Sequence, residues 1–313
     1  MGDQELSMGK LEEIALAFGE SLRRVQIQGG EPTLYTHIYH AISLFSENKK
    51  TDVAVITNGL AGSRIMGICH MFEGEENIRW IVSLNGWGAL HDESKGVPGA
   101  FDKAMGSIKF MKSYGFRVNI QFMPCNENMC DLDAVREFAE TKCDGFLICH
   151  PVRGFKFGKD MAWTIPDNQT IYNLQMQNVS KNPINKWSHE ILCKALRDEK
   201  LLPCWGGRSM IHIDPSGKIR PCGFTDWGSV EVGEIINGGL WRNFFTKKIL
   251  AETVPDKCMY TESGLCNSAG VGWTLRGSLP LILKETPWKI LISDVLVWIF
   301  SKIKKHLSGW IKR

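Results

Sequence analysis

The chain has 313 residues, 43% of them hydrophobic and 23% charged, which is typical of a globular protein of about two domains. The net charge is +3, but residues 287–313 alone carry +5 and the rest carries −2. The body therefore lacks the basic surface of a nucleic-acid-binding domain.

We expect a cytoplasmic protein without a signal peptide, because acidic residues interrupt the first 20 positions. Ten cysteines in such a chain indicate metal ligands or buried thiols rather than disulfides.

Strands and helices alternate through the first half of the chain. Apolar residues at helical spacing predict a first helix over 11–18. Runs rich in Val, Ile and Phe predict strands at 23–28, 52–57, 79–84, 116–122 and 145–150. Helix-length segments connect them at 33–48, 60–72, 98–114 and 131–142. Strands joined by crossover helices predict an α/β fold with a parallel sheet.

The carboxyl ends of these expected strands are polar and rich in glycine. They comprise residues 29–32, 57–59, 83–86, 124–126 and 150–151. Turns are often polar in any protein, so a single such end is weak evidence for a site. Parallel α/β folds nevertheless place their chemistry at this edge of the sheet. The five ends together therefore favour a binding site there.

The first of these ends, GGEP, has the chemistry to hold a zwitterionic ligand. Gly29 and Gly30 lack a Cβ, so a ligand can approach the backbone closely. The Glu31 carboxylate can accept hydrogen bonds from an ammonium group. Pro32 sets the direction of the chain into the next helix. These residues predict a site for an amino acid or a related group.

Three successive strand ends resemble those of the radical S-adenosylmethionine (SAM) enzymes: GGEPTL, ITNG and VSLNG. The resemblance implies an incomplete radical SAM (βα)6 partial TIM-like barrel over residues 1–165. It also implies that residues 29–32 bind the methionine end of SAM and that Ser83 and Asn85 face its ribose. This chain has Asn85 where many relatives have Asp.

Enzymes of that family hold a four-iron cluster on cysteines spaced C-x3-C-x2-C, and an electron from the cluster cleaves SAM to a deoxyadenosyl radical. The sequence contains no such spacing, and its first cysteine is Cys69. We expect the first barrel strand and its cysteine loop to lie upstream of Met1 or to be missing. A mis-called start, a broken gene and a true pseudoenzyme would each produce this pattern. The chain is accordingly expected to be inactive alone.

Other cysteines and histidines lie near the expected strand ends, at spacings that match no cluster loop. Free cysteines are commonly buried as small hydrophobic residues, and we favour this interpretation here. For the histidines we favour packing or hydrogen bonding. The residues concerned are Cys125, Cys130, Cys143, Cys149, His70 and His150.

A connector over 166–200 leads to a cysteine-containing region over 201–275. The turn sequence DPSG predicts a hairpin of 209–213 with 218–220, which would bring Cys204 and Cys222 together. Four thiolates can close a metal site, and Cys258 and Cys266 complete the set. The arrangement resembles a shortened SPASM domain, which implies one auxiliary four-iron cluster. Zinc and a metal-free remnant are the alternatives, although zinc sites usually use C-x2-4-C pairs.

The last segment, 280–313, contains a basic amphipathic helix over 287–313. Its apolar run is interrupted by Asp294 and is too short to span a bilayer. Two interpretations stay open for this helix. It could lie in a membrane interface, or pack onto the cysteine domain or a partner.

For the intact enzyme, the resemblance implies radical modification of an unidentified substrate. A peptide or protein is the default, and some relatives act on small molecules. An active enzyme would need an electron donor such as a flavodoxin or a ferredoxin. The alternative is a non-catalytic protein that binds a peptide or a partner and carries one iron–sulfur or zinc site.

Overall fold

The computed structural model describes residues 5–18, 22–149, 163–167, 170, 173–174, 211–220 and 231. The chain divides into two units, and all of these residues except Ile211 belong to the first, Met1–Asn178 with His212–Phe244. Several predictions fall outside the described residues. They concern His150, Cys204, Cys222, Cys258, Cys266 and the helix over 287–313.

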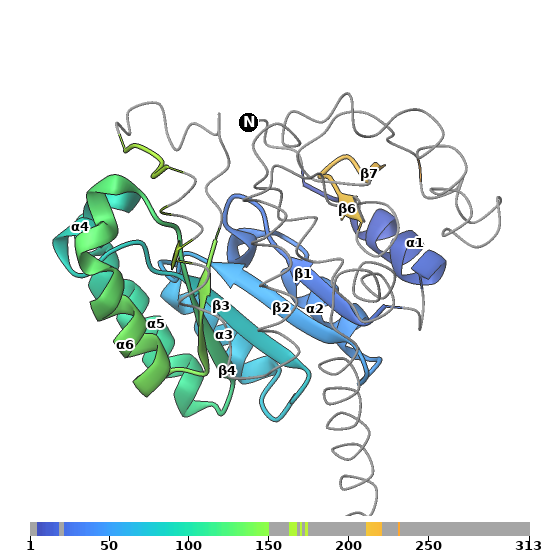
Figure 1. The fold of residues 1–313 in the computed structure, drawn as a ribbon. Coiled ribbons are helices and arrows are strands. Elements are labelled where there is room, and N and C mark those ends of the chain that lie inside the picture. The colour runs from blue at the N-terminus through green and yellow to red at the C-terminus, as the bar shows by residue number, and fades with distance from the viewer. Residues whose placement is uncertain are drawn as a thin grey trace, which may run out of the picture. The chain divides into compact units, whose positions relative to one another are not determined.

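Five parallel strands form one sheet in the order β1-β2-β3-β4-β5 (Figure 1). The strands are β1 (Arg24–Ile27), β2 (Asp52–Thr57), β3 (Ile78–Ser83), β4 (Arg117–Phe122) and β5 (Gly145–Ile148). Each strand pairs with the next one along the chain, which confirms the predicted parallel α/β fold. Among the described residues β1 has a single neighbour, β2.

The connecting helices agree with the sequence pattern, with two additions. They are α1 (Met8–Phe18), α2 (Ile38–Ser46), α3 (Gly62–Met71), α4 (Ala89–Lys95), α5 (Ala100–Ser113) and α6 (Leu132–Lys142), with the 3-10 turns η2 (Pro32–Leu34) and η3 (Asn126–Asp131). The helix predicted over 33–48 is divided, because Glu31 caps η2 and the chain turns before Ile38. The sequence pattern had not indicated α4 or η3.

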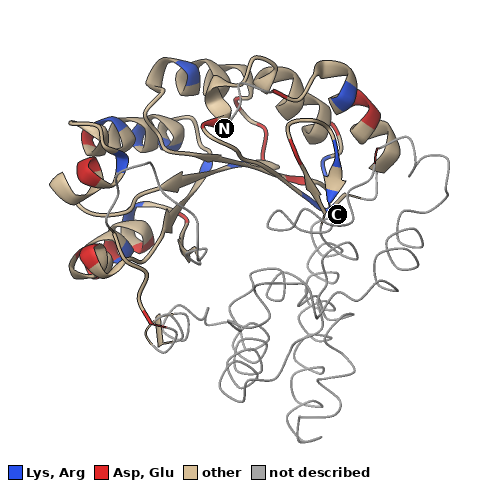
Figure 2. Cartoon of the chain, turned by 90° about the horizontal axis from the view of Figure 1, so that it is seen from above, with Lys and Arg blue, Asp and Glu red and all other residues tan. Residues whose placement is uncertain are grey.

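Alternate residues of each strand face the helices and form the core. Trp80, Val82 and Phe122 are examples, and they pack with side chains of α2, α3, α5 and α6. Figure 2 shows these helices on one face of the sheet. Because strand side chains alternate between faces, the intervening residues point to the opposite face. That face is largely polar, with Arg24, Asp52, Arg79, Ser83, Arg117, Asn119 and Gln121.

The predicted DPSG hairpin is confirmed by β6 (His212–Ile213) and β7 (Ile219–Arg220), which pair antiparallel. Gly217 has φ 85°, a conformation that favours glycine, and its N–H donates to the Asp214 carbonyl at 2.9 Å. The Asp214 carboxylate accepts the Ser216 and Lys218 N–H groups. Within the described ranges, no helix has the length and hydrophobicity needed to cross a membrane.

Candidate functional site at the carboxyl edge of the sheet

Gly29 and Gly30 follow β1 and are exposed. Neither residue has the left-handed φ that would require glycine, and a Cβ at either position would meet no described atom within 4 Å. Neither the backbone conformation nor the packing of the described chain therefore explains the two glycines. A ligand can approach the bare backbone closely at both positions. The predicted binding of the methionine end of SAM at these glycines stays a prediction.

The Glu31 carboxylate has several hydrogen-bond partners within the chain. Its Oε1 accepts from Thr33 N at 3.2 Å, Thr33 Oγ1 at 2.6 Å and Thr57 Oγ1 at 2.7 Å. Within the described part of the chain, its Oε2 accepts from Asn58 N alone, at 2.8 Å. A carboxylate offers about four lone-pair positions, about two on each oxygen. Oε1 is thus saturated, and Oε2 can still accept one donor, such as a ligand ammonium group.

Asn85 follows β3 and is only 9% exposed. Its side-chain Oδ1 accepts the Met123 N–H at 3.2 Å, which joins the ends of β3 and β4. The Oδ1 atom of Asn85 therefore has a structural role. The Nδ2 group has no partner among the described residues and can still donate to a ligand. Ser83 is partly exposed at the end of β3, and its hydroxyl likewise has no described partner.

Two buried residues that sequence reasoning missed hold the Asn85 loop in place. Asn128 donates to the Asn85 carbonyl and the Met123 carbonyl, each at 2.9 Å, and accepts the Cys125 N–H at 2.8 Å. His91 accepts the Asn85 N–H on Nδ1 at 3.1 Å. Burial, aided by the nearby Lys95 charge, lowers the pKa of His91 to about 4. This imidazole is therefore neutral near pH 7, as an acceptor at Nδ1 must be.

Lys95 is a third residue that sequence reasoning missed. It ends α4, immediately before the left-handed Gly96. Burial lowers the pKa of its ammonium group to about 8, although the Glu31 carboxylate acts in the opposite direction. Lys95 is thus close enough to Glu31 to sense its charge, and it supplies a cation at the edge that carries Gly29 and Gly30. The only signal in the sequence was a lysine twelve positions after Ser83.

A short segment from later in the chain contacts the same edge. Thr164 N donates to both carboxylate oxygens of Glu127 in η3, at 2.9 and 2.8 Å. Trp163 Nε1 donates to Glu93 Oε1 in α4 at 3.2 Å. Residues 163 and 164 therefore connect the segments that follow β3 and β4.

The cysteines of the described α/β unit do not form a metal site. Cys69 and Cys125 are buried, and burial raises the pKa of their thiols to about 12 and about 11. Burial likewise raises the pKa of Cys143 and Cys149, which are partly buried. The buried interpretation is wrong for Cys130, which is exposed. Within the described part of the chain, no three His, Cys, Asp or Glu side chains are grouped as metal ligands.

Of the two histidines for which packing or hydrogen bonding was predicted, His70 is described. Its Nδ1 lies 3.2 Å from the Tyr114 hydroxyl, which confirms a hydrogen-bonding role.

No family model matches the sequence. The chain is 23% identical over 228 residues to an AdoMet-dependent heme synthase from Oleidesulfovibrio alaskensis, and the match covers 64% of this chain and 58% of that protein. The structure is similar to Streptococcus suis SuiB bound to S-adenosylmethionine, with a TM-score of 0.56 and 17% identity, over 85% of this chain and 66% of that one. It is also similar to anSMEcpe with bound AdoMet, with a TM-score of 0.54 and 15% identity, over 93% and 91% of the two chains.

Proposed function

We infer that this chain, a member of the radical SAM superfamily, binds S-adenosylmethionine at the carboxyl edge of its sheet. The residues proposed to bind it are Gly29, Gly30, Glu31, Pro32, Ser83 and Asn85, with Lys95 added on structural grounds. The observation that carries this proposal is the open space at Gly29 and Gly30 beside the spare acceptor position of Glu31. SuiB and anSMEcpe, which share the fold, both have structures with this ligand bound.

The proposed activity of the whole protein is radical modification of a peptide or protein. SAM held by residues 29–32 beside a reduced cluster would supply a deoxyadenosyl radical to remove hydrogen from the substrate. SuiB has been seen bound to its precursor peptide SuiA, and anSMEcpe to a Kp18Cys peptide, which supports a peptide substrate. Cys204, Cys222, Cys258 and Cys266 would hold one auxiliary four-iron cluster, and a flavodoxin or ferredoxin would supply electrons.

The 313 residues contain no C-x3-C-x2-C set. We therefore propose that the chain by itself binds SAM without cleaving it reductively. This observation also favours a second candidate, a non-catalytic protein that binds a peptide or a partner.

Calorimetric titration with SAM tests the binding site directly. Gly30→Val adds a side chain where the described protein has only open space, so it should leave the melting temperature unchanged and weaken SAM binding at least tenfold. Gly106→Val is the matched control, because Gly106 in α5 is exposed and equally free of neighbours and is not among the residues proposed to bind SAM. Equal SAM affinity for Gly30→Val and the wild type would overturn the proposed site.

Metal content after anaerobic reconstitution tests the clusters. One auxiliary site predicts about four irons per chain, lost in Cys204→Ala. Under reducing conditions the same sample should yield no deoxyadenosine. About eight irons, or deoxyadenosine production, would show that other cysteines had built a second cluster.

A further inference from the structure

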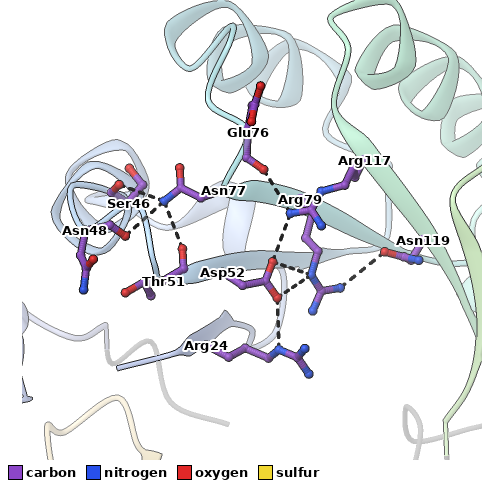
Figure 3. Close-up of polar contacts among 10 residues, drawn as sticks. All are labelled: Arg24, Ser46, Asn48, Thr51, Asp52, Glu76, Asn77, Arg79, Arg117 and Asn119. Carbon is purple, nitrogen blue, oxygen red and sulfur yellow. Dashed lines mark hydrogen bonds and ion pairs between the residues drawn. The ribbon is translucent and has the colours of Figure 1, made fainter. Parts of the chain in front are cut away.

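The amino edge of the sheet, where the strands begin, carries a cluster of charged side chains. Arg24 in β1, Arg79 in β3 and Arg117 in β4 converge on the Asp52 carboxylate in β2, and we call these four residues the arginine cluster (Figure 3). It lies at the end of the strands opposite to Gly29 and Gly30. Arg24 and Gly29 are five positions apart, which corresponds to about 16 Å along an extended chain. The cluster is therefore distinct from the proposed SAM site.

Asp52 bonds all three guanidinium groups. Arg79 Nε lies 3.0 Å from both carboxylate oxygens, Arg24 Nε lies 3.1 Å from Oδ2, and an Arg117 terminal nitrogen lies 3.4 Å from Oδ1. Arg79 also donates to Asn119 Oδ1 at 3.5 Å. Arg79 alone would neutralise Asp52, so Arg24 and Arg117 bring a surplus of two positive charges.

Among the residues that the structure describes, neighbouring acids do not remove this surplus. Asp144 is close enough to Arg117 to interact with its charge, but the Asp144 carboxylate is paired with Lys112 Nζ at 2.7 Å. Glu76 accepts an Arg117 hydrogen bond through its backbone carbonyl at 3.1 Å. Its carboxylate points away from the arginine cluster in Figure 3. Three adjacent guanidinium groups with one carboxylate repel one another unless a further anion is bound.

The surplus arginines are accessible and have donors to spare. The side chains of Arg24 and Arg117 are 63% and 53% exposed. Within the described residues, the two terminal nitrogens of Arg24 have no partner, and neither do Nε and Nη1 of Arg117. Each guanidinium presents a planar set of N–H groups that matches the oxygens of a carboxylate or phosphate.

The backbone beneath the cluster is fixed by hydrogen bonds. Asp52 N donates to the Arg23 carbonyl at 3.0 Å, and Thr51 Oγ1 donates to the Leu22 carbonyl at 3.1 Å. Asn77 Nδ2 donates to the Thr51 carbonyl at 3.1 Å and to the Ser46 carbonyl at 2.9 Å. The backbone that carries the charged side chains is thus fixed before any ligand arrives, which lowers the entropic cost of binding.

We propose that the arginine cluster is a binding site for a small oxyanion of charge −2. The shared chemistry of its ligands is a set of anionic oxygens, from a phosphate group or from two carboxylates. The charge matches the surplus of two, and the donors are all N–H groups. This site does not depend on SAM binding or on any cluster.

Calorimetry at low salt, with inorganic phosphate and with succinate as separate probes, tests the proposal on the full chain. At least one probe should bind to the wild-type protein, and the tighter of the two identifies the source of the anionic oxygens. Arg24→Gln and Arg117→Gln should each weaken that binding about tenfold, because a charge-assisted contact is lost. Their folding should be unaffected, since both side chains are exposed. Lys49→Gln controls for general charge, because Lys49 is an exposed cation paired with Glu75 outside the cluster.

Asp52→Asn separates a binding site from a purely structural ion-pair cluster. Removing the carboxylate raises the surplus charge, so Asp52→Asn should bind the probe as tightly as the wild type or more tightly. The proposal is overturned if neither probe binds, if Lys49→Gln weakens binding as much as Arg24→Gln, or if a folded Asp52→Asn protein loses binding. Should Asp52→Asn fail to fold, the arginine variants still decide the question.

Discussion

The Glu31 carboxylate and the Thr57 hydroxyl form a 2.7 Å hydrogen bond that joins the carboxyl ends of β1 and β2. The same carboxylate accepts the Asn58 N–H on its other oxygen. Glu31 therefore shapes the edge of the sheet even before a ligand binds. The sequence predicted that Glu31 accepts hydrogen bonds from a ligand, and the structure shows that Glu31 also has a structural role.

Glu31→Gln should lower both stability and SAM affinity. The amide replaces one acceptor oxygen with a donor that faces either the Asn58 N–H or the threonine hydroxyls. We expect the free energy of unfolding to fall by about 2 kcal/mol, the usual value for hydrogen bonds to a charged group. Urea denaturation measures this loss. Glu13→Gln, on the exposed surface of α1, should change stability by less than about 1 kcal/mol. Unchanged stability in Glu31→Gln would mean that the hydrogen bonds of Glu31 do not stabilise the fold.

His91 should make stability depend on pH. Its pKa is about 4 in the folded protein and near 6.5 when unfolded, so the unfolded chain binds the extra proton first as the pH falls. The stability contributed by neutral His91 is complete above about pH 6.5 and is lost progressively towards about pH 4. The full loss is about 3 kcal/mol.

Denaturation at a series of pH values measures this effect. His91→Asn keeps an acceptor for the Asn85 N–H but cannot titrate, so its stability should be flatter between pH 4 and 6.5. His70→Asn, at an exposed position, should retain the wild-type slope. Identical slopes for His91→Asn and the wild type would assign the pH dependence to other groups.

The strands of the sheet could be predicted from the sequence, because each strand is a short run of neighbouring apolar residues. Val53, Val55, Trp80, Val82 and their neighbours are apolar within short runs, and buried parallel strands need little else. Helix α4 was missed because it has only seven residues and is flanked by Gly88 and Gly96, and glycines in a sequence indicate turns.

The candidate site was predictable only in part. Gly29, Gly30 and Glu31 could be proposed because they directly follow a strand and match a family pattern, and their binding to SAM stays a prediction. The hydrogen bonds that support the site could not be predicted in this way. Asn128 donates to Asn85 across 43 positions of the chain, and Thr57 donates to Glu31 across 26 positions. Such pairs depend on strand order and register, which a single sequence leaves open. Lys95 lay in the helix that was missed.

Asn128→Ala should be among the most destabilising substitutions at this edge. Asn128 is fully buried, and its removal leaves the Asn85 carbonyl, the Met123 carbonyl and the Cys125 N–H without their partner. We expect a loss of about 3 kcal/mol in the free energy of unfolding, because unpaired buried groups cost about 1–3 kcal/mol each and the cavity can admit water. Asn126→Ala, at an exposed position in the same turn, is the control. Equal losses for the two variants would contradict the assigned role.

Lys95 should make SAM binding depend on pH above neutrality. Its pKa of about 8 means that the side chain is mostly charged at pH 7 and mostly neutral at pH 9. A charged Lys95 can bind the carboxylate of the methionine end, whereas the neutral amine cannot form an ion pair. We expect the wild-type affinity to fall about tenfold across this range, as loss of one charge-assisted contact implies.

Lys95→Gln isolates this effect. Any titration of SAM itself occurs equally with both proteins, so the difference between their pH profiles reports Lys95 alone. At pH 7 the variant should bind SAM about tenfold more weakly than the wild type, and at pH 9 the two should bind almost equally. Parallel profiles across the whole range would show that the Lys95 ammonium group does not contact the ligand. That result would leave Lys95 as a cation that interacts with Glu31 only.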